Sequence, residues 1–188
     1  MELLEESGVT ELSLRAVARR AGVSHTAPYR HYADREALLC AVTAVGYREL
    51  AGRLAAAHAG ASAAEHLAGV AITYVEFALE RPALFRMMCT EPRDCASHHC
   101  DASPALSDVV GTIARRYFSE ADADALGTAL WAAIHGLALL FLDGKVTASA
   151  PTPLADRITA VIQAIVPREG IAARSHPLNT PGPTSNPS

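Results

Sequence analysis

The chain has 188 residues, about half of them hydrophobic, and a formal net charge of −4 at pH 7. This length suits one or two small domains with a substantial core, and the apolar composition indicates that most of the chain is packed helix. The acidic balance argues against a protein that coats nucleic acid through overall charge. Any contact with nucleic acid must therefore be local.

Residues 1–7 predict the end of a first helix, which stops at Gly8, and Leu3 and Leu4 would pack on the segment that follows. Met1 is followed at once by acidic residues, so this N-terminus does not have the pattern of a signal peptide. We therefore expect a cytoplasmic protein.

A second, short helix is predicted from Leu14 to Ala21 because its apolar residues recur at three- and four-residue spacing. Ser13 stands where a capping hydroxyl is wanted, and Gly22 stands where a left-handed residue can end a helix. Val23 is expected to supply the apolar contact that holds the next helix at an angle.

Ser24 is expected to cap a third helix, His25 to about Tyr32, in which Ala27, Pro28 and Tyr32 are available for the core. Its other side chains are donors or aromatic: His25, Thr26, Tyr29, Arg30 and His31. Such groups bond bases and phosphates when a helix lies in a major groove. Residues 12–35 also hold five arginines against one aspartate, a local charge of +4. The segment is predicted to bind DNA; the alternative is a structural helical hairpin with a polar outer helix.

The stretch GVSHTAPYRHYADREALL, residues 22–39, resembles the recognition region of the TetR family of bacterial transcriptional regulators. The matching positions are Gly22, Val23, Tyr29, His31, Tyr32, Asp34, Arg35 and Leu38. The resemblance implies that Thr26, Tyr29, His31 and Arg35 contact DNA, and less directly that His25 does. Family members usually carry further residues before the first helix, so the resemblance also implies a truncated first helix here.

After Asp34, an apolar pattern without a breaker predicts a helix to about Ala57, long enough to link two domains. Ser62 and Glu65 form a capping-box pattern that opens a helix to Glu80. A short helix then starts at Pro82, and a polar loop follows. Three further helices are predicted at about 104–117, 120–142 and 153–166.

The larger half resembles a TetR-family effector domain in its tryptophan followed by a His-Gly pair, Trp131 to Gly136. In that family, small molecules bound among these helices alter DNA affinity. The candidate pocket residues are Tyr74, Phe77, Phe85, Met88, Trp131 and His135. Residues 126–142 carry no charge, so we expect a small, hydrophobic effector. The alternative is ordinary core, with His135 bonded to a backbone carbonyl.

The most apolar helix lies near residues 122–142 and is expected to be buried on more than one side. Its apolar run of 14 residues, Ala129 to Leu142, is shorter than the ~20 residues of a membrane span, so no membrane contact is expected. This helix and the last one offer more apolar surface than one bundle needs, which predicts a two-fold dimer. The candidate interface residues are Ile134, Leu137, Phe141, Ile158 and Ile162.

The polar loop from Cys89 to Ser103 concentrates metal-capable side chains. Cys95, His98, His99 and Cys100 are weak candidates for a metal or redox site, because their spacing fits no standard zinc pattern. No metal and no cofactor are therefore predicted. In a cytoplasmic protein the four cysteines are expected to be reduced.

The sequence thus predicts an all-α protein with a three-helix helix-turn-helix domain at 1–48, a helical ligand-binding and dimerisation domain at 49–166 and a disordered tail at 167–188. The predicted function is a ligand-responsive transcriptional regulator, expected to be a repressor. It would bind a palindromic double-stranded DNA operator as a homodimer and be released by a small hydrophobic effector. The alternative is a helical small-molecule or metal/redox sensor that has lost DNA binding. No enzyme is expected, since the chain has no Ser-His-Asp order, Gly-rich phosphate loop or paired buried carboxylates.

Overall fold

The computed structural model describes residues 1–57, 62–90, 105–147 and 152–166. These residues form helices and no strand, which confirms the all-α prediction. The elements in chain order are α1 (Glu2–Glu11), α2 (Leu14–Ala21), the 3-10 turn η1 (Ala27–Arg30), α3 (Arg35–Ala56), α4 (Ala63–Glu80), α5 (Pro82–Thr90), α6 (Ala105–Tyr117), α7 (Glu120–Leu142) and α8 (Leu154–Ile165).

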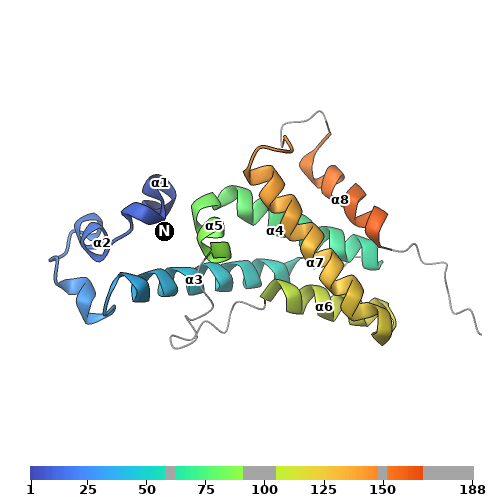
Figure 1. Cartoon of the computed structure of the whole chain (residues 1–188), viewed down its shortest axis with the longest axis horizontal. Helices are drawn as coiled ribbons and strands as arrows, with labels where there is room; N and C mark the ends of the chain where they lie inside the picture. The colour runs from blue at the N-terminus through green and yellow to red at the C-terminus, as the bar shows by residue number, and fades with distance from the viewer. Residues whose placement is uncertain (58–61, 91–104, 148–151, 167–188) are drawn as a thin grey trace, which may run out of the picture.

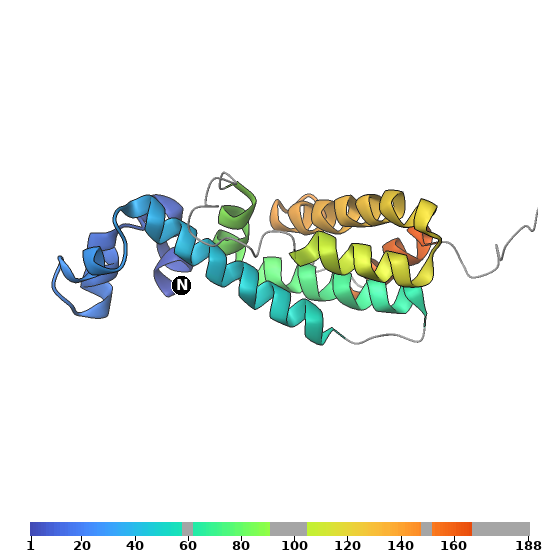
Figure 2. The same cartoon turned by 90° about the horizontal axis from the view of Figure 1, so that it is seen from below.

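The molecule is elongated, with α1, α2 and η1 at one end and the bundle of α4, α6, α7 and α8 at the other (Figure 1). The long helix α3 starts at the first end and runs along the molecule into the bundle, as the view from below also shows (Figure 2). Short helix α5 lies between the two ends and packs against both α1 and α3. The N-terminal helix-turn-helix unit is therefore joined to the bundle by α3 and α5.

Side-chain caps set several helix starts where the sequence predicts them. The Ser13 hydroxyl accepts a hydrogen bond from the Ala16 N–H at 3.2 Å, and the Asp34 carboxylate accepts one from Ala37 at 2.8 Å. Ser62 and Glu65 make both bonds of the capping box. Each such cap contributes about 1 kcal/mol to helix stability. At α7 the expected cap is absent: the Ser119 hydroxyl donates instead to the Asp122 carboxylate at 2.6 Å.

Two glycines bend the N-terminal unit. Gly22 ends α2 with φ 68° and ψ 25°, the left-handed conformation that the sequence predicts. Gly8 has φ 75° and kinks α1 rather than ending it, so that the chain resumes a helical turn up to Glu11. Leu4, before this kink, is fully buried, as expected.

One hydrophobic cluster runs through the described part of the molecule. It includes Leu4, Leu14 and Leu38 of the helix-turn-helix unit as well as Phe77 and Leu130 of the bundle. Each fully buried side chain of this size contributes roughly 1.5–3 kcal/mol. The helix-turn-helix unit and the bundle are therefore joined by packed side chains.

Helix α7 is less buried than the sequence predicts. Trp131 is 40% and Leu140 39% exposed, so one side of the helix faces outward. The segment Asp122–Leu142 is long and apolar enough to cross a membrane by length and composition alone, with 28% of the tested window buried. One such helix is weak evidence for a membrane span, since the core helix of a soluble protein passes the same test. The uncharged apolar run itself is the 14 residues Ala129 to Leu142, which follow Asp122 and Asp124.

Four of the five residues predicted for the dimer interface lie in the core of the single chain. Ile134, Ile158 and Ile162 are fully buried and Phe141 is 6% exposed, whereas Leu137 is half-buried. Periodicity identified the apolar positions of α7 and α8, and within the single chain both helices pack on α4. A contact between two copies would need the outward residues of the same helices.

Several predictions fall on residues outside the described ranges, namely the Cys95, His98, His99 and Cys100 loop and the tail at 167–188. Among the described cysteines, Cys89 is a free, exposed thiol and Cys40 is buried in the core.

Candidate nucleic-acid interface

The turn between α2 and α3 is tighter than the predicted third helix. In place of an α-helix from His25 to Tyr32, the chain forms the 3-10 turn η1 over residues 27–30. Its bonds span three residues: Ala27 N–H to Ser24 C=O at 3.0 Å and Tyr29 N–H to Thr26 C=O at 3.2 Å. Pro28 explains the difference, because proline has no N–H and disfavours the α conformation in the residue before it.

Val23 and Ser24, which precede this turn, do not have the roles that the sequence predicts for them. The Ser24 hydroxyl bonds the Thr26 hydroxyl at 3.2 Å instead of capping a helix. Val23 is 49% exposed rather than buried against the next helix. Its backbone N–H bonds the Ala18 carbonyl at 3.1 Å, so the entry angle of the turn is set by main-chain bonds around Gly22.

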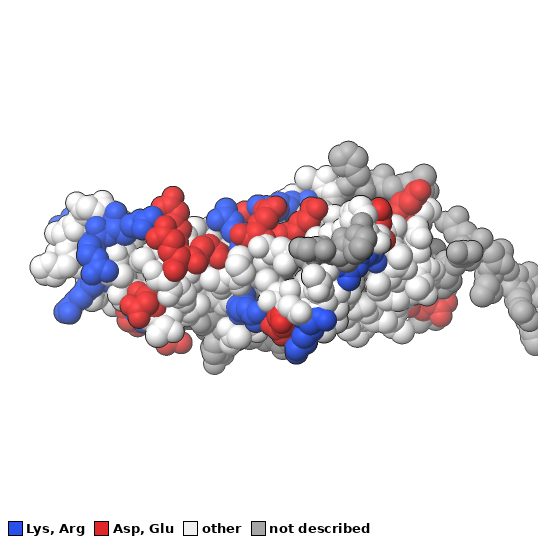
Figure 3. Space-filling view, turned by 90° about the horizontal axis from the view of Figure 1, so that it is seen from above, with Lys and Arg blue, Asp and Glu red and all other residues white. Residues whose placement is uncertain are grey.

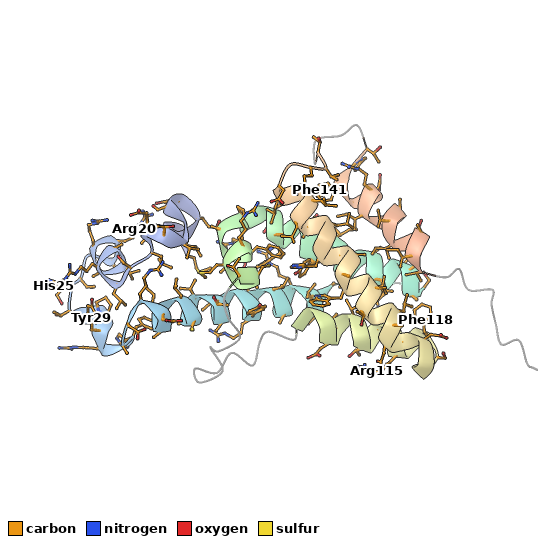
Figure 4. The ribbon with its side chains drawn as sticks, viewed as in Figure 1. Arg20, His25, Tyr29, Arg115, Phe118 and Phe141 are labelled. Atoms are coloured by element: carbon orange, nitrogen blue, oxygen red, sulfur yellow. The ribbon has the colours of Figure 1, made fainter. Side chains whose placement is uncertain are left out.

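The polar side chains of the turn point outward, as predicted. His25, Thr26, Tyr29, Arg30 and His31 are all exposed, whereas Pro28 is buried and Tyr32 is half-buried. Tyr29 has 51% of its surface exposed, which is unusual for a large aromatic side chain. Figure 4 shows His25 and Tyr29 at the end of the molecule farthest from the bundle. The buried proline thus anchors a turn whose outer surface offers hydroxyl, imidazole and guanidinium groups.

Arg35 joins α1 to the start of α3. Its Nε donates to the Leu12 carbonyl at 2.8 Å and its Nη2 donates to the Val9 carbonyl at 2.6 Å. A cation at a helix N-terminus is unfavourable, and these carbonyls of the kinked end of α1 compensate for it. The guanidinium is still exposed, so its predicted contact with a phosphate stays a prediction beside this structural role.

Fewer arginine side chains are available to DNA than the five found in residues 12–35. Arg20 bonds Glu6 at 2.7 Å and Glu2 at 3.0 Å, and the hydrogen bond from Arg20 lowers the pKa of the Glu6 carboxyl. In the described part of the chain, Arg15, Arg19 and Arg30 form no ion pair. Figure 3 shows Lys and Arg side chains over this end of the molecule, followed by a band of acidic ones.

The second candidate site is a cluster of aromatic rings in the bundle. The Tyr74 hydroxyl and His135 Nδ1 lie 2.9 Å apart, so His135 is bonded to a phenol. The alternative given by the sequence, a bond to a backbone carbonyl, is therefore wrong for this nitrogen. Phe85 packs edge-on against Tyr74 with ring centroids 5.4 Å apart, and lies 5.8 Å from the His135 ring. Trp131 lies 6.3 Å from His135 on the outer side.

Burial favours the uncharged form of both bonded partners. It raises the pKa of Tyr74 far above its usual value and lowers the pKa of His135. A neutral pair can offer one donor and one acceptor to an uncharged ligand. We name Tyr74, Phe85, Trp131 and His135 the ring cluster.

The other two predicted pocket residues, Phe77 and Met88, belong to the same buried core, one helical turn from Tyr74 and Phe85. Phe77 is fully buried with the Arg53 guanidinium 5.3 Å from its ring centroid. Met88 is at the junction of α5 and α3, where its carbonyl accepts a hydrogen bond from the Tyr47 hydroxyl at 2.8 Å. Both pack within the core, and their predicted place in an effector pocket stays a prediction.

Sequence reasoning missed two features. A surface cavity of about 240 Å³ between α6 and α7 is lined by Asp108, Gly111, Arg115, Ala123, Asp124, Gly127, Thr128 and Trp131. In addition, the Glu5 carboxylate of α1 accepts hydrogen bonds from the first turn of α5. Neither has a local sequence signal, because the contributing residues come from separate helices.

Comparisons with known proteins agree with this arrangement. Residues 1–42 match the family model described as bacterial regulatory proteins, tetR family, and residues 67–165 match the tetracyclin repressor-like C-terminal domain. A search of curated proteins finds no match.

Solved structures share the fold over most of the chain. A protein of unknown function from Rhodococcus sp. RHA1 is 34% identical, with a TM-score of 0.73 over 87% of this chain and 88% of the other. The TetR family transcriptional regulator PfmR from Thermus thermophilus is 18% identical, with a TM-score of 0.64 over 87% and 92%. A tetR-family regulatory protein from Rhodococcus RHA1 is 19% identical, with a TM-score of 0.65 over 88% and 91%.

The two family models together cover the helix-turn-helix unit and the bundle, and the second alone spans more than half of the 188 residues. Proteins of this kind are DNA-binding regulators rather than enzymes. The chain belongs to the TetR family of bacterial transcriptional regulators.

Proposed function

We propose that this regulator binds a palindromic operator as a homodimer, acts as a repressor in the cytoplasm, and is released from DNA by a small hydrophobic effector. One observation carries the proposal. The exposed polar turn and the ring cluster are parts of the same packed structure, connected by the hydrophobic cluster along α3 and α5. A ligand that changes the packing in the bundle can therefore displace the turn.

The DNA contact is assigned to the outer surface of η1 and its flanks. His25, Thr26, Tyr29, Arg30 and His31 supply the exposed polar groups, and Arg35 is expected to reach a phosphate while it holds α1. Base edges in a major groove accept bonds from hydroxyl, imidazole and guanidinium groups. Because η1 is only one turn, few bases can be read by one copy, and two copies are needed for a specific operator.

The dimer contact is assigned to the outward side of α7 and α8. Trp131, Leu140 and Val161 are 40%, 39% and 36% exposed, and residues 126–142 carry no charge. A contiguous exposed apolar patch marks an interaction site, and the proposal is that these side chains form part of one. A two-fold contact would bury it in a closed pair.

The effector is assigned to the ring cluster. The neutral Tyr74–His135 pair and the ring of Phe85 favour an uncharged, largely apolar molecule with one hydrogen-bonding group. Such a ligand weakens DNA binding only by the difference in its affinity for the DNA-competent and DNA-incompetent forms.

The test starts with selection of duplexes from a random pool by the full chain, followed by fluorescence anisotropy. A two-fold symmetric consensus bound by two chains supports the proposal. An asymmetric or single half-site, or a monomer by sedimentation at micromolar concentration, contradicts it. If no duplex is selected at all, the alternative of a helical sensor without DNA binding is favoured. Compounds that stabilise the protein in a thermal-shift screen are then tested for release of the selected duplex.

A further inference from the structure

The first turn of α5 is capped by a side chain from α1. The Ala83 N–H donates to Glu5 Oε2 at 3.1 Å and the Leu84 N–H donates to Glu5 Oε1 at 3.2 Å. The residue before this helix is Arg81, which has no acceptor in its side chain. The half-buried Glu5 carboxylate thus satisfies main-chain donors that have no partner within the helix, and its charge is favourable at that end.

Helix α5 also packs closely against α3. A methyl group added at Gly46 of α3 would lie 2.7 Å from Met88 Sδ and 2.9 Å from Leu84 Cδ1. The hydroxyl of Tyr47, the next residue of α3, donates to the Met88 carbonyl at the other end of α5. Close packing at Gly46 and the bonds at both ends leave α5 little freedom to move independently of α1 and α3.

The same helix carries a ring of the ring cluster. Phe85 follows the capped residue Leu84 and packs edge-on against Tyr74. Helix α5, which lies between the two ends of the molecule (Figure 1), therefore touches the candidate effector site through Phe85, the linking helix through Met88, and the helix-turn-helix unit through Glu5. The cap is a polar contact that ties the helix-turn-helix unit to this helix.

We propose that Glu5 is a positioning residue for DNA binding. By capping α5, its carboxylate fixes the orientation of the helix-turn-helix unit on the bundle, and this orientation sets the distance between the two reading turns of a dimer. The inference rests on the proposed function, since it concerns the spacing of two half-sites. A ligand at the ring cluster that displaces α5 would move this cap and change the preferred spacing.

The test compares Glu5→Gln with Glu11→Gln. Glu11 lies in the same helix and is exposed, so its substitution makes the same charge change near DNA without removing the cap. Both variants and the unsubstituted chain are titrated with the selected operator, with versions one base pair longer or shorter at the centre, and with a single half-site. One base pair moves a half-site by about 3.4 Å and rotates it by about 35°.

The unsubstituted chain and Glu11→Gln should prefer the selected spacing by about tenfold or more. Glu5→Gln should lower this preference to about threefold or less, with binding of the single half-site unchanged within about twofold. Hydrogen exchange at residues 83–84 should rise about fivefold in Glu5→Gln, as expected for loss of a helix cap, and stay unchanged in Glu11→Gln.

The proposal is overturned if Glu5→Gln shows faster hydrogen exchange at residues 83–84 but keeps the preference for the selected spacing. The cap would then stabilise α5 without positioning the helix-turn-helix unit. If Glu5→Gln does not fold, Glu5→Asp replaces it: its carboxylate keeps the charge but is one methylene shorter, and the same loss of spacing preference is expected. The proposed function fails in a different way, through the absence of any duplex selected by the unsubstituted chain, and this inference would fall with it.

Discussion

Removal of the Tyr74 hydroxyl tests the ring cluster most directly. Tyr74 is 5% exposed and its hydroxyl bonds His135 at 2.9 Å. Tyr74→Phe keeps the ring and its contact with Phe85 but leaves the His135 nitrogen without this partner. The net value of a neutral hydrogen bond is about 1 kcal/mol, and an unsatisfied buried polar atom costs about 1–3 kcal/mol. Because His135 is only half-buried and water can reach it, we expect the free energy of unfolding to fall by about 1 kcal/mol.

The assay is urea unfolding followed by circular dichroism, with His135→Leu and the double substitution completing a cycle. The coupling energy between the two side chains should be about 0.5–1.5 kcal/mol, and the melting temperature of Tyr74→Phe should fall by about 2–4 °C. If Tyr74→Phe is as stable as the unsubstituted chain and the cycle shows no coupling, the bond does not contribute and the assignment of a neutral, mutually satisfied pair is refuted.

The same pair predicts a pH dependence. Burial lowers the pKa of His135 in the folded protein below its unfolded value of about 6.5. Between these two values the unfolded chain binds a proton that the folded chain does not, so stability rises with pH in this window and is lost as the pH falls below about 6.5. The loss should be smaller in His135→Leu. An unchanged slope between about pH 7 and pH 5 in that variant would contradict the lowered pKa.

Further predictions concern single positions. Tyr29→Ala should weaken operator binding by about 1–3 kcal/mol with little effect on scrambled duplexes, whereas Arg35→Ala should weaken both alike and also lower the melting temperature; equal anisotropy curves for Tyr29→Ala and the unsubstituted chain would contradict the DNA-reading assignment. Leu140→Glu should give a folded monomer in sedimentation, whereas Ile158→Glu buries a charge and should destabilise the protein by more than about 3 kcal/mol. A folded monomer from Ile158→Glu instead would restore the original interface assignment. Gly46→Ala should cost about 1–3 kcal/mol, measured by urea unfolding, because its methyl group overlaps α5; an unchanged midpoint would show that α5 can yield there.

The sequence predicts features that depend on neighbouring residues. Ser13, Asp34 and the Ser62–Glu65 box cap helices through atoms three positions away, and Gly22 ends α2 because of its own backbone freedom. The exposed polar surface of η1 was predicted from residue types alone. Its 3-10 form was not, since proline is tolerated in the first turn of an α-helix as well.

Contacts between distant segments could not be predicted in the same way. Arg35 donates hydrogen bonds to carbonyls at the end of α1, and Glu5 accepts hydrogen bonds from N–H groups of α5. In both cases the partners are more than 20 residues apart in the sequence. In α7 the apolar positions go nearly all round the helix, so periodicity could not tell which side meets the chain's own core. Ile134 and Trp131 are three positions apart, yet the first is fully buried and the second is 40% exposed.

This difference within α7 bears on how the regulator works. Ile134 and His135 are neighbours, so the same turn of helix that packs into the core also holds the ring cluster, while Trp131 extends the cluster to the surface assigned to the partner copy. Under the proposed function, a ligand bound at His135 would therefore act on two contacts together: inward on Phe85 and α5, and outward on the side of α7 that we assign to contact with the second chain. The distance between the two reading turns depends on the tilt of the helix-turn-helix unit and on the contact between the two copies. A small displacement at each of these two places would therefore be enough to change that distance so that the turns no longer match the half-sites of the operator.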